Sequence, residues 1–239
     1  MLHPLAFAAQ LLWPARCAGC DHLVTPDCAF CPACEPTLLA LADACPACAL
    51  PLIRQRCPRC ALEPFPFAQA RAAFAYGGAV TDALLRFKHG GRADLARPLG
   101  RTFLPTLLPL LAVADAILPV PLHPRRLRSR GFNQALELVR AARTAVDGVV
   151  ARRTRWPPLW VDTLRRTRDT PALGRLSPAE RRSMVADAFR VAMPHRVRGR
   201  RLLVVDDVMT TGATLAGCAR ALLEAGAVEV GVAALARAL

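Results

Sequence analysis

The most informative segment of the chain is residues 202–214, which read LLVVDDVMTTGAT. Its first four residues are apolar, as in a parallel strand buried on both faces. Two carboxylates end this run, and threonine and glycine follow them. The pattern then predicts an amphipathic helix over 215–224, a glycine stop at Gly226 and a second strand over 228–235. Together these features predict a β–loop–α–β unit with polar residues at a strand's carboxyl end, where open α/β sheets bind ligands.

The loop of this unit suits a phosphate group. The candidate phosphate-binding residues are Thr210, Thr211, Gly212, Ala213 and Thr214. Amides at a helix N-terminus can surround an anion, threonine hydroxyls add donors, and a glycine permits close approach of the backbone. A Walker-type P-loop is excluded because this loop contains no lysine. Asp206 and Asp207 precede the loop and are predicted to accept hydrogen bonds from vicinal sugar hydroxyls, so the pattern predicts a ribose 5-phosphate site. The competing interpretation is an ordinary strand-turn-helix.

Residues 204–214 resemble the signature of type I phosphoribosyltransferases, which use 5-phosphoribosyl 1-pyrophosphate (PRPP). The resemblance implies an α/β fold in which helices flank a parallel sheet. It also implies that Asp206 and Asp207 are the catalytic pair, and that PRPP binds together with Mg²⁺.

A second candidate loop follows a predicted strand at 116–120. Residues 121–134 read PLHPRRLRSRGFNQ, and their prolines and four arginines favour a rigid loop that binds an anion. Because this loop also follows an apolar strand, we expect it at the same edge of the sheet as the first. The candidate residues for the pyrophosphate side are Pro121, Leu122, Arg125, Arg126 and Arg130. The competing interpretation is an exposed basic turn.

Between the two ends of the chain, the pattern predicts a strand over 71–76 and a helix over 80–88. Residues 92–111 are predicted to be helical but broken at their prolines. Lys88, the only lysine, ends the first of these helices, where it either caps the helix or reaches an anionic ligand.

The positive charge is concentrated in one third of the chain. The whole protein has 32 basic and 18 acidic residues, a net charge of +14. Residues 121–201 hold 20 arginines and 6 acids, also +14, so the remainder is neutral. A field focused in this way attracts polyanions, either a pyrophosphorylated sugar or a nucleic-acid backbone. The competing interpretation is a solvated basic face.

Nine of the ten cysteines lie in the first 65 residues, and eight of them form four Cys-x-x-Cys pairs. The pairs are Cys17/Cys20, Cys31/Cys34, Cys45/Cys48 and Cys57/Cys60. Each pair can present two thiolates to one tetrahedral ion, which predicts one or two structural zinc ions. Sequential pairing gives two zinc ribbons; interleaved pairing, disulfides and an iron–sulfur cluster are the alternatives. Cys28 is an alternative metal ligand, because it forms a further Cys-x-x-Cys pair with Cys31. Cys218 is predicted to be a small core residue.

Pro64–Pro66 is predicted to be the hinge between a ribbon domain, 1–65, and a phosphoribosyltransferase-like domain, 66–239. The four cysteine pairs, residues 120–126 and 130–134, and the 204–214 motif together resemble the ComF/GntX family. These are phosphoribosyltransferase-like bacterial proteins with an N-terminal double zinc ribbon. The resemblance implies a cytoplasmic role in DNA uptake and natural transformation, with single-stranded DNA and DNA-uptake proteins as partners. The chain departs from the family pattern at Leu173, Arg175 and Met184, where the family has amides and a glycine. These changes are expected to affect the recognition of any acceptor more than the binding of PRPP.

Three functions follow from this reading. The first is a PRPP-binding accessory protein of DNA uptake, the second an active phosphoribosyltransferase with an unknown acceptor, and the third a zinc-ribbon nucleic-acid binder with a vestigial site. No membrane span is predicted, because prolines and an aspartate interrupt the apolar segment 104–120. Residues 2–13 are apolar, but no basic residue precedes them and no cleavage site follows, so a cytoplasmic location is expected. The sequence does not predict an oligomeric state.

Overall fold

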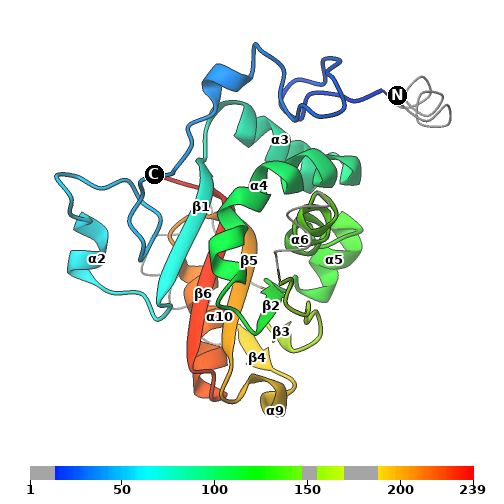
Figure 1. Ribbon diagram of the computed structural model, residues 1–239. Coiled ribbons are helices and arrows are strands. Elements are labelled where there is room, and N and C mark those ends of the chain that lie inside the picture. Colours follow the sequence, from blue (N-terminus) through cyan, green and yellow to red (C-terminus); the bar gives the residue numbers. More distant parts are fainter. Residues whose placement is uncertain (1–13, 147–154, 170–187) are drawn as a thin grey trace.

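The computed structural model describes residues 14–146, 155–169 and 188–239. Its centre is a parallel sheet of four strands in the order β1-β6-β5-β2 (Figure 1). The strands are β1 (Gln69–Ala75), β2 (Ala116–Pro119), β5 (Arg201–Met209) and β6 (Glu229–Arg237). The apolar runs of β5 and β6 are almost wholly buried, as expected for the middle of a parallel sheet. The predicted α/β class, a parallel sheet flanked by helices, is confirmed.

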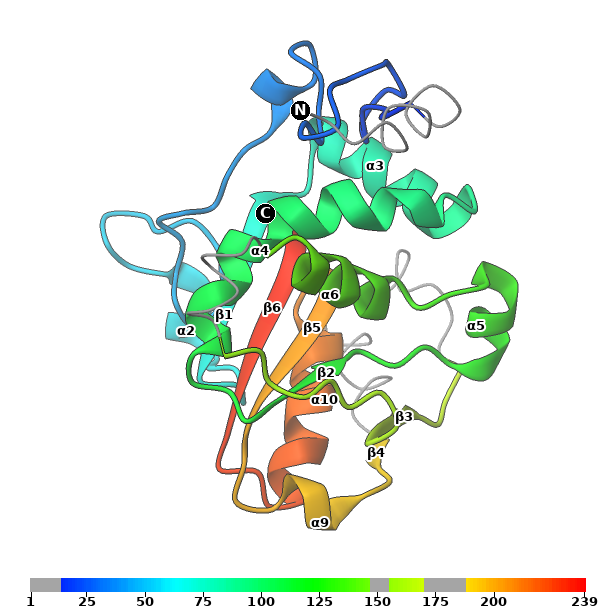
Figure 2. The ribbon, with the colours of Figure 1, turned by 45° about the vertical axis from the view of Figure 1, so that its right-hand side comes forward.

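Helices cover both faces of the sheet (Figure 2). One face carries α3 (Gly78–His89), α4 (Ala96–Leu111) and α6 (Gln134–Thr144), and the other carries α10 (Ala213–Glu224). Side chains of a strand alternate between faces. Accordingly, Leu203 and Val205 of β5 pack in the core beneath α3, α4 and α6, whereas Leu202 and Val204 pack beneath α10. This alternation also decides where the two aspartates that follow them point.

The prediction that prolines break the helix over 92–111 is wrong. A short 3₁₀ turn, η2 (Ala93–Leu95), leads into α4, which continues through Pro105 and Pro109. Both prolines are exposed and lie four residues apart on the outer face, so solvent can reach the carbonyls that lack a helical donor. The opposite face buries leucines together with Phe103, and this packing offsets the cost of the prolines.

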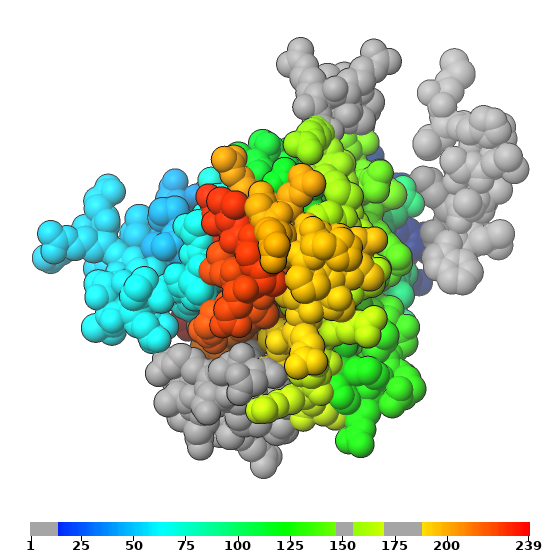
Figure 3. Space-filling model, turned by 90° about the horizontal axis from the view of Figure 1, so that it is seen from below, coloured from blue at the N-terminus to red at the C-terminus, as the bar shows by residue number. Residues whose placement is uncertain are grey.

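A small antiparallel pair, β3 (Leu164–Arg166) and β4 (Phe189–Val191), lies beside the main sheet and is followed by α9 (Pro194–Val197). Figure 3 views the molecule from the end at which the main strands begin, and residues of the β4–α9 region cover part of that end. This pair was not predicted from the sequence. The expectations for residues 2–13, 173, 175 and 184 lie outside the described residues.

The N-terminal segment has little regular structure, namely η1 (Glu35–Thr37) and α2 (Pro58–Leu62). It lies along the edge strand β1, where Leu41 N donates to Ala73 O at 3.0 Å and Ala75 N donates to Leu39 O at 2.8 Å. The segment around Cys17 and Cys31 belongs to the same core as α3, and the segment after Cys45 lies beside β1 (Figure 1). The domain boundary at residue 65 stays a prediction. Among the described residues, no helix has the length and apolar character needed to span a bilayer.

Candidate functional site

The predicted β–loop–α–β unit is present, and its loop lies at the carboxyl end of β5. Residues 210–212 join β5 to α10, so Ala213 and Thr214 are the first two residues of that helix. Gly212 occupies the N-cap position with a φ of 81°, in the left-handed region that favours glycine. A Cβ on Gly212 would also lie 2.7 Å from Cε1 of Phe65. Backbone conformation and close packing therefore both require glycine at this position.

The acidic pair lies at the end of β5 with its two carboxylates on opposite faces of the sheet, because neighbouring strand residues alternate. Asp207 is buried on the α3 side, where Nζ of Lys88 lies 2.9 Å from its Oδ1. The side chains of Lys88 and Asp207 are 20% and 9% exposed. The role of Lys88 is thereby decided: this last-turn residue of α3 pairs with the acidic motif. Sequence spacing gave no sign of the pair, since 119 positions separate the two residues.

Asp206 lies on the α10 side. Desolvation, together with the negative charge of Asp207, raises the pKa of Asp206 to about 7. Its Oδ1 accepts a hydrogen bond from the amide of Asp207 at 2.9 Å. The positive charges of Lys88 and Arg166 act in the opposite direction on the pKa of Asp206. Arg166 on β3 is a buried guanidinium that the sequence analysis did not select. The two aspartates are therefore inequivalent, one paired with a lysine and the other poised to titrate near neutral pH.

The second loop lies at the same edge as the first. β2 and β5 are adjacent and parallel, with Pro119 opposite Val205, and Val120 N donates to Val205 O at 2.8 Å. Pro121 and Leu122 follow directly at the carboxyl end of β2. The expected proximity of the two loops is thus what the structure shows.

The basic segment 121–134 is not a continuous loop, which corrects the prediction. Its arginines lie on α5 (Pro124–Arg130), which begins at the imidazole cap of His123 and ends at Gly131 with a φ of 79°. Proline at the first helical position and glycine after the last are ordinary helix boundary signals, and they outweighed the loop-like composition. The side chain of Asn133 caps α6 and donates to Val120 O at 2.9 Å, which ties the segment to the end of β2.

Two of the three predicted pyrophosphate-side arginines lie beside a carboxylate. Asp169 lies 3.8 Å from Nη1 of Arg125, 3.7 Å from Nε of Arg126 and 3.7 Å from Nδ1 of His123. Arg130 instead donates to Oε1 of Gln134 at 3.1 Å. An anion of the chain itself therefore occupies the centre of this basic cluster. Asp169 was not predicted from the sequence, because only folding brings it to α5.

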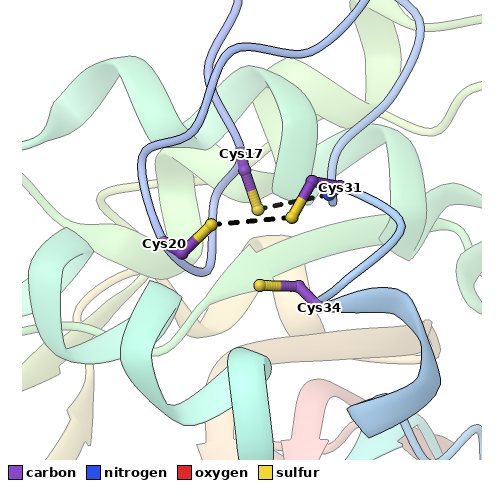
Figure 4. Close-up of side chains that lie close together, drawn as sticks. All are labelled: Cys17, Cys20, Cys31 and Cys34. Atoms are coloured by element: carbon purple, nitrogen blue, oxygen red, sulfur yellow. Dashed lines mark hydrogen bonds between the residues drawn. The ribbon is translucent and has the colours of Figure 1, made fainter.

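The eight paired cysteines form two groups in sequential order. One group is Cys17, Cys20, Cys31 and Cys34, and the other is Cys45, Cys48, Cys57 and Cys60. Within each group all four sulfur atoms lie within 4.8 Å of one another, and Figure 4 shows the sulfurs of the first group pointing toward a common centre. Four sulfurs at about 2.3 Å from a tetrahedral zinc lie about 3.8 Å apart. The observed separations of 3.5 Å for Cys20–Cys31, 3.9 Å for Cys45–Cys60 and 3.4 Å for Cys48–Cys57 match that spacing.

One thiol in each group has a lowered pKa. The backbone amide of Cys34 lowers the pKa of Cys31 to about 6, although burial opposes the shift. Burial likewise opposes the shift at Cys57, where the amide of Cys60 and neighbouring thiols lower the pKa to about 7. Burial raises the pKa of Cys34, Cys48 and Cys60 in the same groups. The fit to zinc therefore rests on the convergence of four sulfur atoms in each group rather than on these pKa values. Cys28 lies outside both groups and accepts from the hydroxyl of Thr25 at 3.2 Å, and Cys218 is buried as predicted.

Comparison with known proteins agrees with this architecture. A family model described as a phosphoribosyl transferase domain matches residues 163–239. The DNA utilization protein YhgH of Escherichia coli O157:H7 is 34% identical over 204 residues, covering 82% of this chain and 84% of the relative. The competence protein F of Haemophilus influenzae is 34% identical over 54% of this chain and 52% of its own. The competence protein ComFC of Bacillus subtilis is 26% identical over 92% of this chain and 86% of its own.

Among solved structures, the glutamine PRPP amidotransferase from B. subtilis, complexed with ADP and GMP, matches 63% of this chain with 22% identity and a TM-score of 0.37. This chain spans only 30% of that structure's chain. The family is instead established by the length and identity of the match to YhgH, together with the transferase-domain match and the paired cysteine groups. The chain belongs to the ComF/YhgH family of phosphoribosyltransferase-domain proteins.

Proposed function

We propose that this protein binds PRPP at the edge of the sheet where β5 and β2 end, and that it supports the handling of transforming DNA in the cytoplasm. The observation that carries the proposal is the pairing of β2 with β5, which brings the 210–214 loop, the acidic pair and the basic helix α5 to one edge. The names of its relatives, a DNA utilization protein and competence proteins, support the role in DNA handling.

Each part of the edge suits a different part of the ligand. Amides at the start of α10 and the threonine hydroxyls hold the 5-phosphate. Asp207, held in place by Lys88, accepts hydrogen bonds from the ribose hydroxyls. Arg125 and Arg126 neutralise the pyrophosphate, which takes the place of Asp169 between them. This assignment keeps the 210–214 loop, Asp207, Arg125 and Arg126 from the sequence prediction and adds Lys88 and Asp169.

The two implied metals differ in their fit to the chain. Zinc fits the two four-cysteine groups, where it would crosslink the knuckles and add to folding stability. Mg²⁺ has no comparable donor set, because the carboxylates of the acidic pair point to opposite faces of the sheet. Among the described residues, the two cysteine groups are the only clusters of three or more potential metal ligands. In the proposal Mg²⁺ therefore arrives on the phosphates of the ligand, as is usual for this ion.

A second candidate function is phosphoribosyl transfer to an acceptor that the sequence does not identify. The raised pKa of Asp206, about 7, favours it, because a carboxylate that titrates near neutral pH can accept a proton from an incoming nucleophile. Asp206 and Asp207 would also stabilise positive charge that develops on the sugar as pyrophosphate leaves.

Titration calorimetry with PRPP and Mg²⁺ tests the binding proposal. The wild type should saturate, and Asp207→Asn should weaken binding about tenfold or more, which corresponds to ~1.4 kcal/mol. The matched control is Asp162→Asn, which removes an exposed carboxylate whose ion pair among the described residues is with Arg196 at 3.3 Å. No binding by the wild type at millimolar PRPP would refute the proposal. A pyrophosphate-release assay on the same samples then separates the two functions: binding without release favours the accessory role.

Fluorescence anisotropy with a single-stranded oligonucleotide tests the DNA part. The 20 arginines of residues 121–201 predict phosphate contacts, so the affinity should fall steeply between 50 and 200 mM salt, by about 10³-fold or more. An affinity that does not change with salt contradicts this part of the proposal. DNA binding by a wild type that does not bind PRPP would instead favour a zinc-ribbon nucleic-acid binder.

A further inference from the structure

A single buried arginine joins the second cysteine group to the 210–214 loop. Arg237 is the last residue of β6 and is 3% exposed. Its Nε donates to the carbonyl of Cys48 at 3.0 Å, inside the second group. Its Nη1 donates to the carbonyl of Met209 at 3.0 Å and also to that of Thr210, where β5 ends and the loop begins. Residues far apart in the chain, 48 and 209–210, are thus held by one guanidinium.

A second contact, through Phe65, also links the second cysteine group to the 210–214 loop. The ring of Phe65 abuts Gly212, so that a Cβ there would lie 2.7 Å from the ring. Phe65 also stacks on Phe67, with ring centroids 4.7 Å apart. The guanidinium of Arg59, a residue between Cys57 and Cys60, lies 4.7 Å from the Phe65 centroid. The second cysteine knuckle therefore supports an aromatic ring that limits the space beside the loop.

A metal-loaded second cysteine group would balance the charge of Arg237. Among the described residues no carboxylate lies within ion-pairing distance of Arg237, and its hydrogen bonds all go to neutral carbonyls. A buried cation without a counter-charge is costly. With a divalent ion bound, the four cysteines of the second group would carry a net charge of −2 as thiolates, and this would supply the counter-charge where Arg237 reaches the group. Metal binding and burial of Arg237 should therefore stabilise each other.

The first cysteine group is docked differently and serves as an internal control. Arg86 of α3 donates to the carbonyl of Ala18 at 2.7 Å and also to that of Gly19, both between Cys17 and Cys20. Gly19 packs closely on Ala79 of the same helix. These contacts hold the first group on α3, and none of them touches the 210–214 loop.

We propose that the second cysteine group, when it holds its metal, fixes the 210–214 loop through Arg237 and Phe65, so that metal occupancy at this one group sets the affinity of the loop for phosphate. Arg237 is a positioning residue in this scheme, because it reaches the ligand only through the carbonyls of the loop. The part of the inference that concerns affinity rests on the proposed PRPP site, whereas the part that concerns loop order does not.

Hydrogen–deuterium exchange of peptides covering 209–216, without any ligand, tests loop order. Cys48→Ser should speed exchange there about tenfold or more, which corresponds to ~1.4 kcal/mol of local opening. The matched control is Cys17→Ser, which should speed exchange in α3 and leave 209–216 at the wild-type rate. Arg237→Met should reproduce the effect of Cys48→Ser while the first group keeps its metal. If either variant fails to fold, stepwise chelation of wild-type protein, with metal release followed by a chromogenic indicator, provides the same comparison.

Calorimetry with PRPP and Mg²⁺ on the same samples tests the affinity. Loss of the second metal should weaken PRPP binding about tenfold. Loss of the first metal serves as the control for exchange at 209–216 only, because it loosens α3, which carries Lys88. Unchanged exchange at 209–216 together with unchanged PRPP affinity after loss of the second metal would overturn the inference and leave the proposed function intact. If exchange at 209–216 speeds up on loss of the second metal but the wild type does not bind PRPP, the proposed function is refuted. The coupling between the second cysteine group and the loop is then supported.

Discussion

Removing the positive charge of Lys88 should destabilise the protein by an amount that the geometry allows us to calculate. Lys88 Nζ lies 2.9 Å from Asp207 Oδ1, and the two side chains are 20% and 9% exposed. Loss of one partner from a buried ion pair costs about 3–5 kcal/mol, because the remaining charge is left buried and uncompensated. Since Lys88 is one-fifth exposed, the lower end applies, and Lys88→Met should cost about 3 kcal/mol. For a domain of this size the melting temperature should fall by about 6–12 °C.

Thermal unfolding at pH 7, followed by circular dichroism, measures this change. The double variant Lys88→Met/Asp207→Asn should recover most of the loss, because no buried charge then lacks a partner. Arg196→Met serves as the matched control: its pair with Asp162 is exposed on both sides, at 41% and 49%, and should be worth less than about 1 kcal/mol. The reasoning is refuted if Lys88→Met melts with the wild type, or if the double variant is less stable than Lys88→Met alone.

Three further outcomes are expected. Gly212→Ala should lower the free energy of unfolding by about 1–3 kcal/mol and abolish PRPP binding, because the φ of 81° and the 2.7 Å approach of the aromatic ring both exclude a Cβ; wild-type affinity would contradict the loop assignment. The pKa of Asp206 in the folded protein, about 7, lies above its ordinary value of 3.8, so the folded state binds this proton more tightly and stability falls as pH rises from about 4 to about 7. Asp206→Asn should therefore stabilise the protein against urea by about 2–4 kcal/mol at pH 8 but not at pH 4, and equal effects at both pH values would exclude Asp206 as the titrating group. Cys31→Ser should lower the zinc content by one ion per chain, whereas Cys28→Ser should leave it unchanged, as elemental analysis of the purified variants would show.

Local patterns in the sequence predicted the parts of the site that are built from consecutive residues. The strand, glycine loop and helix of 201–226 lie as predicted, because burial, helix capping and the conformational freedom of Gly212 act within one short segment. The four cysteine pairs were recognised for the same reason, since a knuckle needs only a turn between two thiols. Helix α5 was missed even though Pro124 and Gly131 mark its ends, because composition was given more weight than these boundary signals.

What only the tertiary structure decided is which distant residues meet. Strand order places β2 beside β5, and no local pattern specifies that order. Lys88 reaches Asp207, and Asp169 contacts arginines of α5. Arg237 joins Cys48 to the 210–214 loop through hydrogen bonds that span up to 189 positions. The physical reason is that motifs record short-range constraints on backbone and burial, whereas charges are paired only when the core has packed and excluded water.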